Sequence, residues 1–392
     1  MPVMEEGRVR IRKRGVVRVR SGHPWVYRSD IIDVNDVPPG GIATVCDERD
    51  AVIGKAFYSS ESQISLRFLV RGKTSVNEDF FRQRFDQADD LRARMGVDFS
   101  VSRRIHSEGD FIPGLIVDRY GEYLVVQSLT QAADRLQSFF ASLLQDRYKP
   151  RSIVFRNDNK IRELEGLPLV QTCSGETPPD QVVVSEGQKE IAIPLTTGQK
   201  TGGYLDQREN HQAARRYARG RALDGFCYGG GFALQLSDVC DQIDAVDLSP
   251  AAVELARNNV ERNCLPNINC IEGNVFDFLR ERWAAGERYD TIVLDPPAFA
   301  RNKESLPGAL RGYKEINNRA MRLLKDGGVL VTCSCSHHVS EPLFAEMLAE
   351  AGCDAGVWLH VLERRIQAPD HPVLLTVPET LYLKCFIVQI RY

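Results

Sequence analysis

The sequence lacks the patterns that would assign it to several common classes of protein. It has no apolar run of the length that a membrane-spanning helix needs. Its N-terminal segment, Met1 to Arg20, is charged where a secretory signal peptide needs an apolar stretch. Its 10 cysteines include no Cys-x-x-Cys pair and no cysteine and histidine spacing typical of zinc. We therefore expect a cytoplasmic protein with reduced thiols, no membrane contact and no bound metal.

A strong excess of charge of one sign is also missing. The chain of 392 residues has 50 basic and 53 acidic side chains and a formal net charge of −3. This balance excludes a polycation that coats nucleic acid, but it allows a local basic patch. The length exceeds that of one ordinary domain, so we expect several domains that each bury a core.

A local basic patch lies near the N-terminus. Arginines alternate with apolar residues from Arg8 to Arg14, and the alternation resumes after Gly15 at Arg18 and Arg20. A period of two predicts that these arginines lie on one face of successive strands. An edge strand charged against aggregation explains the pattern alone equally well. The candidate nucleic-acid contacts in this region are Arg10, Arg12, Arg18, Arg20 and Trp25.

The pattern of turns and apolar segments changes along the chain and predicts three domains. Short β-like segments over residues 1–72 predict a small barrel. Residues 73–188 form a mixed α+β segment, with an exposed connecting helix over Asn77 to Met95 and an amphipathic helix over Gln131 to Gln145. Residues 189–392 alternate between strand and helix, which predicts a Rossmann-like, mostly parallel sheet. The expected fold class is therefore α/β multidomain.

The elements of the last domain follow from its apolar segments. The expected strands are Ala222 to Gly225, Ala245 to Asp247, Asn269 to Glu272, Thr291 to Leu294 and Val329 to Thr332. The expected helices are Asn210 to Arg219, Pro250 to Asn263, Val275 to Arg282, Gly308 to Leu324 and Pro342 to Ala351. A long β-like run from Glu379 to Arg391 has no helix after it. We expect that run to form an antiparallel hairpin at the edge of the sheet.

A glycine-rich turn follows the first of these strands. Glycines from Gly225 to Gly231 allow a ligand to approach the backbone closely. Asp247 ends the next strand about 20 residues later, where a carboxylate accepts hydrogen bonds from a ribose. Because three other residues follow Gly225, the spacing differs from Gly-x-Gly-x-x-Gly and favours a cofactor without a pyrophosphate. S-adenosylmethionine (SAM) fits that description.

Residues around this turn complete the expected cofactor pocket. Asn274 either contacts the adenine or caps the helix that begins at Val275, and both roles stay open. Arg208 and Lys200 meet either the cofactor carboxylate or an RNA phosphate, and Asp206 caps the helix near Gln207. The expected cofactor contacts are Phe226, Tyr228, Gly229, Asp247, Leu248, Asn274, Val275, Asp295, Pro296 and Arg208.

Two strand tips carry the candidate catalytic groups. Asp295 is followed by Pro296 and Pro297, and the two prolines give a stiff turn that aims the carboxylate at a planar substrate. Cys335 follows the fifth strand, and a cysteine thiolate adds readily to an electron-poor ring carbon. Alone, the cysteine would be explained as a buried filler and the Asp-Pro-Pro string as a turn. Behind a nucleoside pocket, the pair favours an enzyme that attacks a nucleobase.

Taken together, these residues resemble the class I methyltransferases of the large-subunit (23S) ribosomal RNA cytosine-C5 type, which carry an N-terminal PUA domain. Gly22 to Tyr27 resembles the PUA segment, and Pro113 to Gly121 resembles the middle domain. Gly198 to Arg208 resembles the hairpin before the catalytic domain, and its Lys-Thr-Gly and Leu-Asp-Gln-Arg strings are highly specific. Aligned on Gly327-Gly328, the family's Ser-Cys-Ser nucleophile falls on Ser334-Cys335-Ser336.

The resemblance implies a covalent reaction on RNA. Cys335 would add to C6 of a cytosine, and Asp295 would hold N3 and the exocyclic amine of the base. The cofactor would be SAM and the partner RNA, specifically large-subunit rRNA, with Lys200 among the RNA contacts. The segment from Pro296 to Phe299 would line the pocket for a flipped base. A homodimer is one option for the assembly, which the sequence does not decide.

The chain also departs from the pattern of related enzymes. Broader cytosine-C5 enzymes have a second cysteine where this chain has Ala298, so the base that removes the C5 proton is not identified. The turn has Cys227-Tyr228-Gly229-Gly230 where the family often has Ser-Tyr-Thr-Gly, and we expect Gly229 to keep the turn. The roles of His337 and His338 are not given by the sequence. The alternatives are methylation of an exocyclic base amine without a covalent adduct, a nicotinamide oxidoreductase, and a non-catalytic RNA-binding protein.

Overall fold

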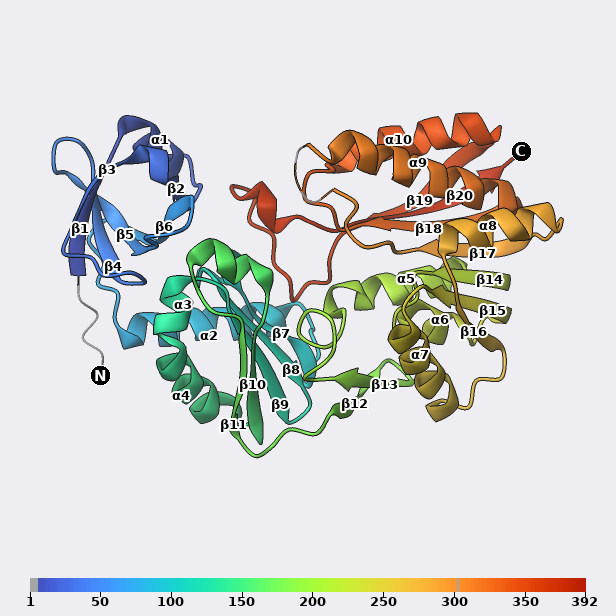
Figure 1. Cartoon of the computed structure of the whole chain (residues 1–392), viewed down its shortest axis with the longest axis horizontal. Coiled ribbons are helices and arrows are strands. Elements are labelled where there is room, and N and C mark those ends of the chain that lie inside the picture. Colours follow the sequence, from blue (N-terminus) through green and yellow to red (C-terminus); the bar gives the residue numbers. More distant parts are fainter. Residues whose placement is uncertain (1–5, 301, 303) are drawn as a thin grey trace. The chain divides into compact units, whose positions relative to one another are not determined.

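The computed structural model describes residues 6–300, 302 and 304–392 of the chain (Figure 1). They divide into two compact units. The first contains the N-terminal part up to Val182, together with Ile193–Leu205 and Pro369–Thr380. The second contains Val183–Ala192, Asp206–Ala368 and Leu381–Tyr392. The expected domain boundaries stay predictions, and the start of the first one at residue 1 lies outside the described residues.

The N-terminal part of the first unit is a six-stranded sheet of order β2-β6-β5-β4-β1-β3. Its strands are β1 (Glu6–Ile11), β2 (Trp25–Tyr27), β3 (Ile31–Asn35), β4 (Ile42–Cys46), β5 (Val52–Tyr58) and β6 (Ile64–Arg71), and a 3-10 turn, η1, spans Arg28–Asp30. β1 pairs in parallel with β4 and antiparallel with β3. Val9, Val45 and Leu66 are fully buried, as the alternation of apolar residues along these strands predicts.

The arginine-rich segment after β1 is a helix, α1 (Lys13–Arg20), so the prediction of a strand through Arg18 and Arg20 is wrong. The buried residues of α1 are Gly15, Val16 and Val19, which is a helical spacing. A Cβ atom on Gly15 would lie 3.2 Å from the side chain of Val26, so the helix packs closely on β2. The alternation here is too short to distinguish a period of two from one of 3.6. The arginines consequently do not share one face of successive strands.

The rest of the first unit is built on a five-stranded sheet of order β11-β10-β9-β8-β7. Its strands are β7 (Val101–His106), β8 (Leu115–Tyr120), β9 (Tyr123–Ser128), β10 (Ser152–Asn157) and β11 (Val170–Gly175). Its helices and 3-10 turns are α2 (Glu78–Arg94), η2 (Ser107–Asp110), α3 (Gln131–Arg135), α4 (Gln137–Tyr148), η3 (Lys160–Glu165) and η5 (Pro378–Thr380). The single helix expected over 131–145 is therefore two helices.

Helix α2 belongs to the core, so its prediction as an exposed connection is wrong. Phe80, Phe81, Phe85 and Ala88 are all buried in it, and Phe81 and Phe85 are fully buried. The bulk of the phenylalanines compensates for the small number of apolar positions, because one aromatic ring buries a large apolar area. A count of apolar positions therefore underestimates the apolar area that such a helix face buries.

The second unit contains a seven-stranded sheet of order β16-β15-β14-β17-β18-β20-β19 (Figure 1). Its strands are β14 (Gly220–Gly225), β15 (Cys240–Asp247), β16 (Ile268–Glu272), β17 (Tyr289–Leu294), β18 (Leu324–Ser334), β19 (Trp358–Arg365) and β20 (Lys384–Arg391). Its helices are α5 (Arg208–Tyr217), α6 (Gly231–Leu236), α7 (Pro250–Arg262), α8 (Val275–Ala284), α9 (Leu306–Leu323) and α10 (Glu341–Ala355). The short elements before them are β12 (Gln181–Glu186), paired with β13 (Lys189–Pro194), and the 3-10 turn η4 (Leu205–Gln207).

The direction of the strands confirms a mostly parallel sheet with an antiparallel edge. β14 pairs in parallel with β15 and with β17, while β20 runs antiparallel to both β18 and β19. The edge hairpin therefore joins Trp358–Arg365 to Lys384–Arg391, and the run from Glu379 supplies only one of its strands. Strand order reverses on the two sides of β14, and open α/β sheets bind ligands at such a reversal, beyond the carboxyl ends of the strands.

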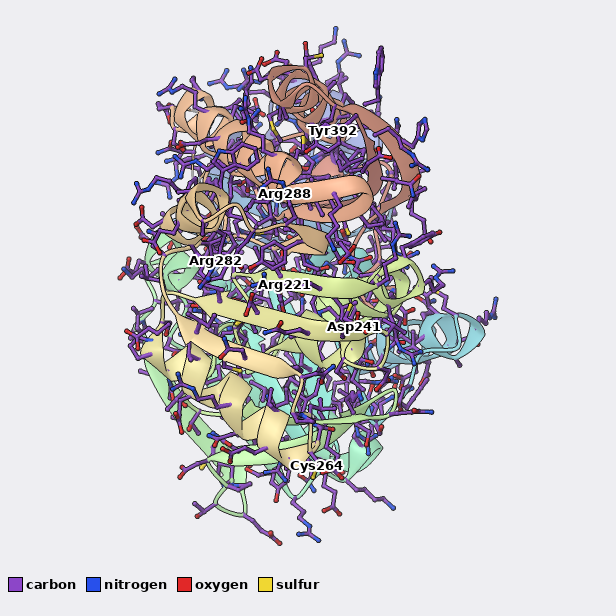
Figure 2. All side chains as sticks on the ribbon, turned by 90° about the vertical axis from the view of Figure 1, so that its right-hand side faces the viewer. Arg221, Asp241, Cys264, Arg282, Arg288 and Tyr392 are labelled. Carbon is purple, nitrogen blue, oxygen red and sulfur yellow. The ribbon has the colours of Figure 1, made fainter. Side chains whose placement is uncertain are left out.

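Charged side chains hold the opposite, amino ends of the strands. Arg221 forms ion pairs with Asp244 (3.0 Å) and Glu287 (2.6 Å), and Arg282 pairs with the same Glu287 (2.7 Å). The hydroxyl of Tyr289 donates to Asp244 at 2.8 Å. Figure 2 labels Arg221 and Arg282 near this end of the sheet. These ion pairs occupy the amino ends of the strands, whereas open α/β sheets bind ligands at the carboxyl ends.

None of the described helices is both long and apolar enough to cross a lipid bilayer.

Candidate active site

The turn after β14 is held against the neighbouring strand β15. The backbone N–H groups of Phe226 and Cys227 both donate to the carbonyl of Val246, at 2.8 and 3.1 Å. One carboxylate oxygen of Asp247 accepts from the N–H of Tyr228 at 3.0 Å, and the other accepts from the N–H of Ser249 at 2.9 Å. Asp247 thus orders the turn and lies half-buried at the strand end, where the sequence predicts a ribose contact.

The backbone of this turn is unusual because three of its residues have positive φ. Phe226, Tyr228 and Gly230 have φ of +67°, +47° and +84°. Gly230, and not Gly229 as expected, is therefore the left-handed glycine of the turn. The carbonyl of Gly229 instead accepts from the side-chain amide of Asn259 at 2.9 Å, and a Cβ on Gly229 would lie 3.1 Å from Leu255. Gly229 is small because α7 passes close to it.

The substitution Gly230→Ala is expected to lower the free energy of unfolding by about 1–2 kcal/mol, the cost of a side chain in the left-handed region. Space is not the cause, since the nearest atom to the added Cβ would lie 3.6 Å away. Chemical denaturation of the two proteins measures the difference. Gly308→Ala in α9 is the matched control. Gly308 does not have a positive φ, and the nearest atom to a Cβ added there would lie 3.8 Å away. An unchanged stability in Gly230→Ala would contradict the need for a left-handed residue.

A buried carboxylate lies below the turn. Asp224 is 1% exposed, and one of its oxygens accepts from the N–H of Ala233 at 2.9 Å. Its other oxygen has no hydrogen-bond partner in the described structure. Burial is the main cause that raises the pKa of Asp224 to about 7. A buried acceptor without a donor is costly, so this oxygen is a natural contact for a ligand N–H group.

His211 of α5 is a titratable group close to this carboxylate. Its Nδ1 lies 2.7 Å from a carboxylate oxygen of Glu186, and its ring packs edge-on against Phe232. Burial opposes protonation, but the Glu186 carboxylate outweighs it and the pKa of His211 is raised. A Cβ atom on Gly231 would lie 2.6 Å from this ring, so only glycine fits there. Sequence reasoning missed His211, because its partners come from separate segments.

The end of β16 contributes the third edge of the expected cofactor pocket. The side chain of Asn274 accepts from the N–H groups of Phe276 and Asp277, at 2.9 and 3.4 Å, so the expected helix cap is present. Its adenine contact stays a prediction. Val275 is 2% exposed and packs in the core, whereas Leu248 after β15 is 65% exposed. An exposed leucine beside the turn supplies an apolar surface that a ligand would cover.

Two other expected residues lie near the start of α5. Arg208 is half-buried and is the first residue of the helix, while Gln207 and not Asp206 occupies the N-cap position. One oxygen of Asp206 accepts instead from the hydroxyl of Tyr382 at 2.7 Å. Lys200 belongs to the first unit, where its ammonium lies 4.3 Å from the centre of the Tyr204 ring.

The tips of β17 and β18 bring the two candidate catalytic segments together. The thiol of Cys335 lies 3.9 Å from the carbonyl oxygen of Pro296. The N–H of Asp295 donates to the carbonyl of Gly225 at 3.2 Å, which joins this tip to the glycine turn. Pro296 is buried and Asp295 is half-buried. The folded chain thus gathers the carboxylate, the thiol and the turn at one edge of the sheet.

The two cysteines at the end of β18 have different surroundings. Cys333 is fully buried, and burial raises the pKa of its thiol well above the ordinary value. Cys335 is partly exposed. A thiolate is the reactive form of cysteine, so burial disfavours Cys333 as a nucleophile and leaves Cys335 as the reachable thiol.

A buried tyrosine orders the loop around Cys335. The hydroxyl of Tyr313 lies 3.1 Å from the Ser334 hydroxyl and 3.0 Å from the Ser336 hydroxyl. Ser336 also accepts from the N–H of Ala300 at 3.1 Å, which ties the loop to the segment after the two prolines. Both serines are fully buried, so they hold the backbone and leave only the cysteine between them partly exposed.

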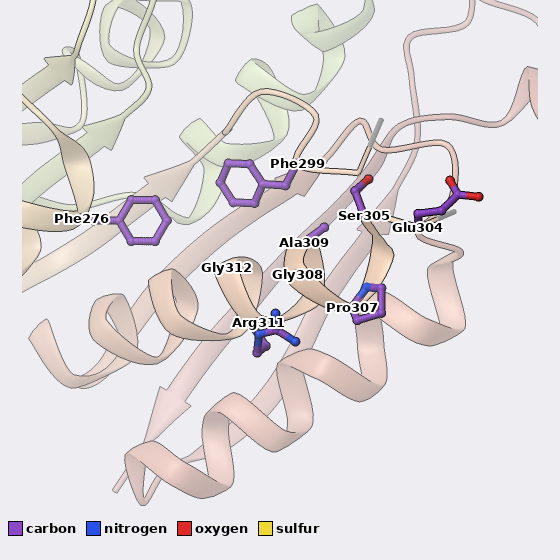
Figure 3. Close-up of a pocket in the computed structure, with 9 residues that line it drawn as sticks. All are labelled: Phe276, Phe299, Glu304, Ser305, Pro307, Gly308, Ala309, Arg311 and Gly312. Atoms are coloured by element: carbon purple, nitrogen blue, oxygen red, sulfur yellow. The ribbon is translucent and has the colours of Figure 1, made fainter. Parts of the chain in front are cut away.

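An open cavity of about 530 Å³ lies beside the Pro-Pro segment (Figure 3). It is lined by Phe276, Phe299, Glu304, Ser305, Pro307, Gly308, Ala309, Arg311 and Gly312. The rings of Phe276 and Phe299 are 6.2 Å apart, and Phe299 also packs at 4.6 Å against Tyr313. The cavity thus presents an aromatic wall connected through Tyr313 to the loop of Cys335. Pro297 and Ala298, which precede Phe299 in the chain, are exposed.

The expected RNA contacts near the N-terminus are partly engaged within the protein. Arg10 pairs with Asp33, and Arg18 pairs with the buried Asp30 at 3.0 Å and lies over the ring of Tyr27. Trp25 is half-buried, and its indole N–H donates to Glu108 at 3.0 Å. The exposed members of the set are Arg12 and Arg20.

In the described part of the chain, no group of three or more His, Cys, Asp or Glu side chains is placed to hold a metal ion.

Comparison with known proteins gives one consistent pattern. A family model of a PUA-like domain matches residues 9–71, and a methyltransferase domain model matches residues 218–368. The chain is 39% identical over 377 residues to ribosomal RNA large subunit methyltransferase I of Erwinia tasmaniensis. The alignment covers 94% of this chain and 95% of that relative. The protein of that name from Escherichia coli K12 is 38% identical over 379 residues, with the same coverage.

A solved structure supports the same fold. A methyltransferase in complex with SAH has a TM-score of 0.84 to this chain, at 18% identity, and the match covers 97% of this chain and 99% of the other. This likeness and the two domain matches confirm the fold class that the sequence predicts, a PUA-like β domain followed by a Rossmann-like domain with a mixed sheet.

Proposed function

The chain belongs to the ribosomal RNA large subunit methyltransferase I family, and we propose that it forms 5-methylcytosine in large-subunit ribosomal RNA. Membership of this family supports SAM-dependent methylation of that RNA. The finer assignment rests on one observation, the partly exposed thiol of Cys335 at 3.9 Å from the Pro296 carbonyl, beside Asp295. Direct methylation of an amine needs no thiol at this position.

The residues at the strand ends fit SAM. The buried oxygen of Asp224 that has no partner suits an ammonium or N–H donor of the cofactor. Asp247 offers carboxylate oxygens at the end of β15, and Asn274 and Val275 would contact the adenine. Phe226, Tyr228 and Arg208 complete the proposed set, together with Gly229, Leu248 and Pro296 as neighbours. Bound SAM supplies a methyl group activated on a sulfonium sulfur.

In the proposed reaction, Cys335 acts as a covalent nucleophile. Its thiolate sulfur forms a bond to C6 of the cytosine, and the electron pair of the C5–C6 double bond becomes available at C5. Once C5 has gained the methyl group, its proton leaves, the double bond re-forms and the bond between the sulfur and C6 breaks. Asp295 holds N3 and the exocyclic amine: N3 takes up a proton from solvent as the thiolate adds, the carboxylate stabilises the protonated N3, and that proton returns to solvent on elimination.

The surrounding residues position the base and the RNA. The stiff turn at Pro296 and Pro297 keeps the Asp295 carboxylate at a constant place next to the thiol. The flipped base would enter beside Phe299, which lines the open cavity. Arg12, Arg20 and Lys200 are exposed and would contact RNA phosphates, with Arg10, Arg18 and Trp25 in supporting positions. We place the reaction in the cytoplasm.

The proposal predicts that the purified protein, supplied with SAM and protein-free large-subunit rRNA, produces 5-methylcytidine. Mass spectrometry of the digested RNA measures the product, and a protein-containing subunit as substrate shows which form is preferred. The same RNA made with 5-fluorocytosine should give a covalent complex, since fluorine at C5 blocks the last elimination. N4-methylcytidine without such a complex would support amine methylation instead, and RNA binding without any methylation would support a non-catalytic role.

A further inference from the structure

A buried lysine lies beside the candidate nucleophile. Lys384 is the first residue of β20 and pairs across the sheet with Ser334. It is 3% exposed, and its ammonium donates to the carbonyl of Ser336 at 2.7 Å and to the carbonyl of Tyr382 at 2.9 Å. Both flanking positions of Cys335 are therefore in contact with this one residue.

Among the residues that the structure describes, no carboxylate forms an ion pair with Lys384. Its contacts are two neutral carbonyl oxygens, which accept two of the three N–H groups of an ammonium. Burial lowers the pKa of Lys384 to about 8, whereas the proximity of Cys335 acts in the opposite direction. The lysine is thus mainly protonated at neutral pH. Burial of a cation costs free energy, so a group placed this way is better explained by an interaction with an anion.

Cys335 is the candidate source of that anion. The titratable groups at these strand ends include Asp295 after β17, Tyr313 of α9, and His337 and Tyr382, whose rings are 5.7 Å apart, together with the buried thiols of Cys333 and Cys385. Burial is the main cause that raises the pKa of Tyr313, so its hydroxyl stays neutral. A carboxylate at Asp295 would disfavour a neighbouring thiolate. Lys384 is therefore the cation that would compensate both anions.

We propose that the ammonium of Lys384 is a positioning residue that holds Cys335 as a thiolate and orients the loop that carries it. The thiol proton is released to solvent, and the negative sulfur remains beside the lysine. The ammonium also anchors the Ser336 carbonyl, so charge and position are supplied by the same side chain. This inference rests on the proposed function only for the use made of the thiolate.

The test measures ionisation of Cys335 without RNA or SAM. The full chain is treated with iodoacetamide over a range of pH, and mass spectrometry follows alkylation of the peptide that contains Cys335. In the unmodified protein, alkylation should rise at a pH below about 8.5, the ordinary range of a free cysteine. In Lys384→Met, the profile should move upward by one pH unit or more, so alkylation at neutral pH falls about tenfold. Lys384→Arg, which keeps the charge, should restore most of the difference.

Cys173 of β11 is the internal control, because it is exposed and lies in the first unit. Its alkylation profile should be the same in every variant. Methyl transfer by Lys384→Met should also recover as the pH is raised, which a purely structural defect would not do. An unchanged Cys335 profile in a folded Lys384→Met protein, judged by its melting temperature, would overturn the proposal.

The unmodified protein provides a second way to refute the inference if Lys384→Met does not fold. A Cys335 profile at or above the ordinary range would then mean that the lysine does not stabilise the thiolate. This test can fail or succeed independently of the proposed function. If Cys335 is alkylated at a pH below the ordinary range and a Cys335→Ala protein is fully active, covalent methylation is refuted. The Lys384 inference then still stands.

Discussion

Replacement of Cys335 by alanine is expected to lower the rate of methyl transfer by roughly 10⁴-fold or more, the scale on which loss of a covalent nucleophile acts. Without the thiolate, C5 of cytosine is not nucleophilic enough to accept the methyl group. The measurement is the initial rate of transfer of labelled methyl groups from SAM to large-subunit rRNA. Affinity for SAH should change little, because the thiol is assigned to the base and not to the cofactor.

Cys333→Ala is the matched control for this experiment. Cys333 lies two residues away on the same strand and is fully buried, so its loss tests the effect of removing a nearby sulfur from the core. It should retain most of the activity and lose some stability. Full activity in Cys335→Ala would refute the covalent route and leave amine methylation as the better explanation.

The substitution Asp295→Asn is expected to reduce the rate of methyl transfer by about 10²- to 10³-fold, as loss of one preorganised electrostatic contact to the transition state does. The amide keeps the size of the side chain but removes the charge that pairs with N3 and the exocyclic amine of the cytosine. Rapid-quench measurement of a single turnover isolates the chemical step. The fluorocytosine complex should also form more slowly, because addition of the thiolate is the step that Asp295 assists.

Asp290→Asn is the control for the charge change. Asp290 lies at the opposite end of the same strand β17 from the Pro-Pro turn and pairs with Lys325 at 2.7 Å. Its substitution should affect stability alone. Equal loss of activity in both variants would show that the effect of Asp295 is structural.

Local patterns were sufficient for the architecture around the site. The segment from Thr291 to Leu294 is a short run of β-branched and apolar residues between Asp290 and Asp295, a pattern typical of a buried parallel strand. The same patterns placed Gly225, Asp295 and Cys335 at strand ends. Because the carboxyl ends of parallel strands share one edge, their proximity followed from the fold class.

The errors arose where packing outweighed a short pattern. The segment with Arg18 and Arg20 alternates like a strand, yet Gly15 allows close packing on β2 and the segment forms a helix. α2 has few apolar positions, yet three phenylalanines are enough to bury it. In both cases the deciding quantity was the shape of the partner surface, which no local window contains.

The sequence by itself determined the fold class and the strand-end positions of Gly225, Asp295 and Cys335. Only the tertiary structure decided the electrostatic surroundings of that cysteine. Lys384 lies 49 residues after it in the chain, and the antiparallel pairing of β18 with β20 brings the lysine to the loop. His211 likewise meets Glu186 and Asp224, which come from separate segments of the chain. Strand-end positions are local properties of a pattern, whereas the charge around a buried group is a sum over contacts that exist only after folding.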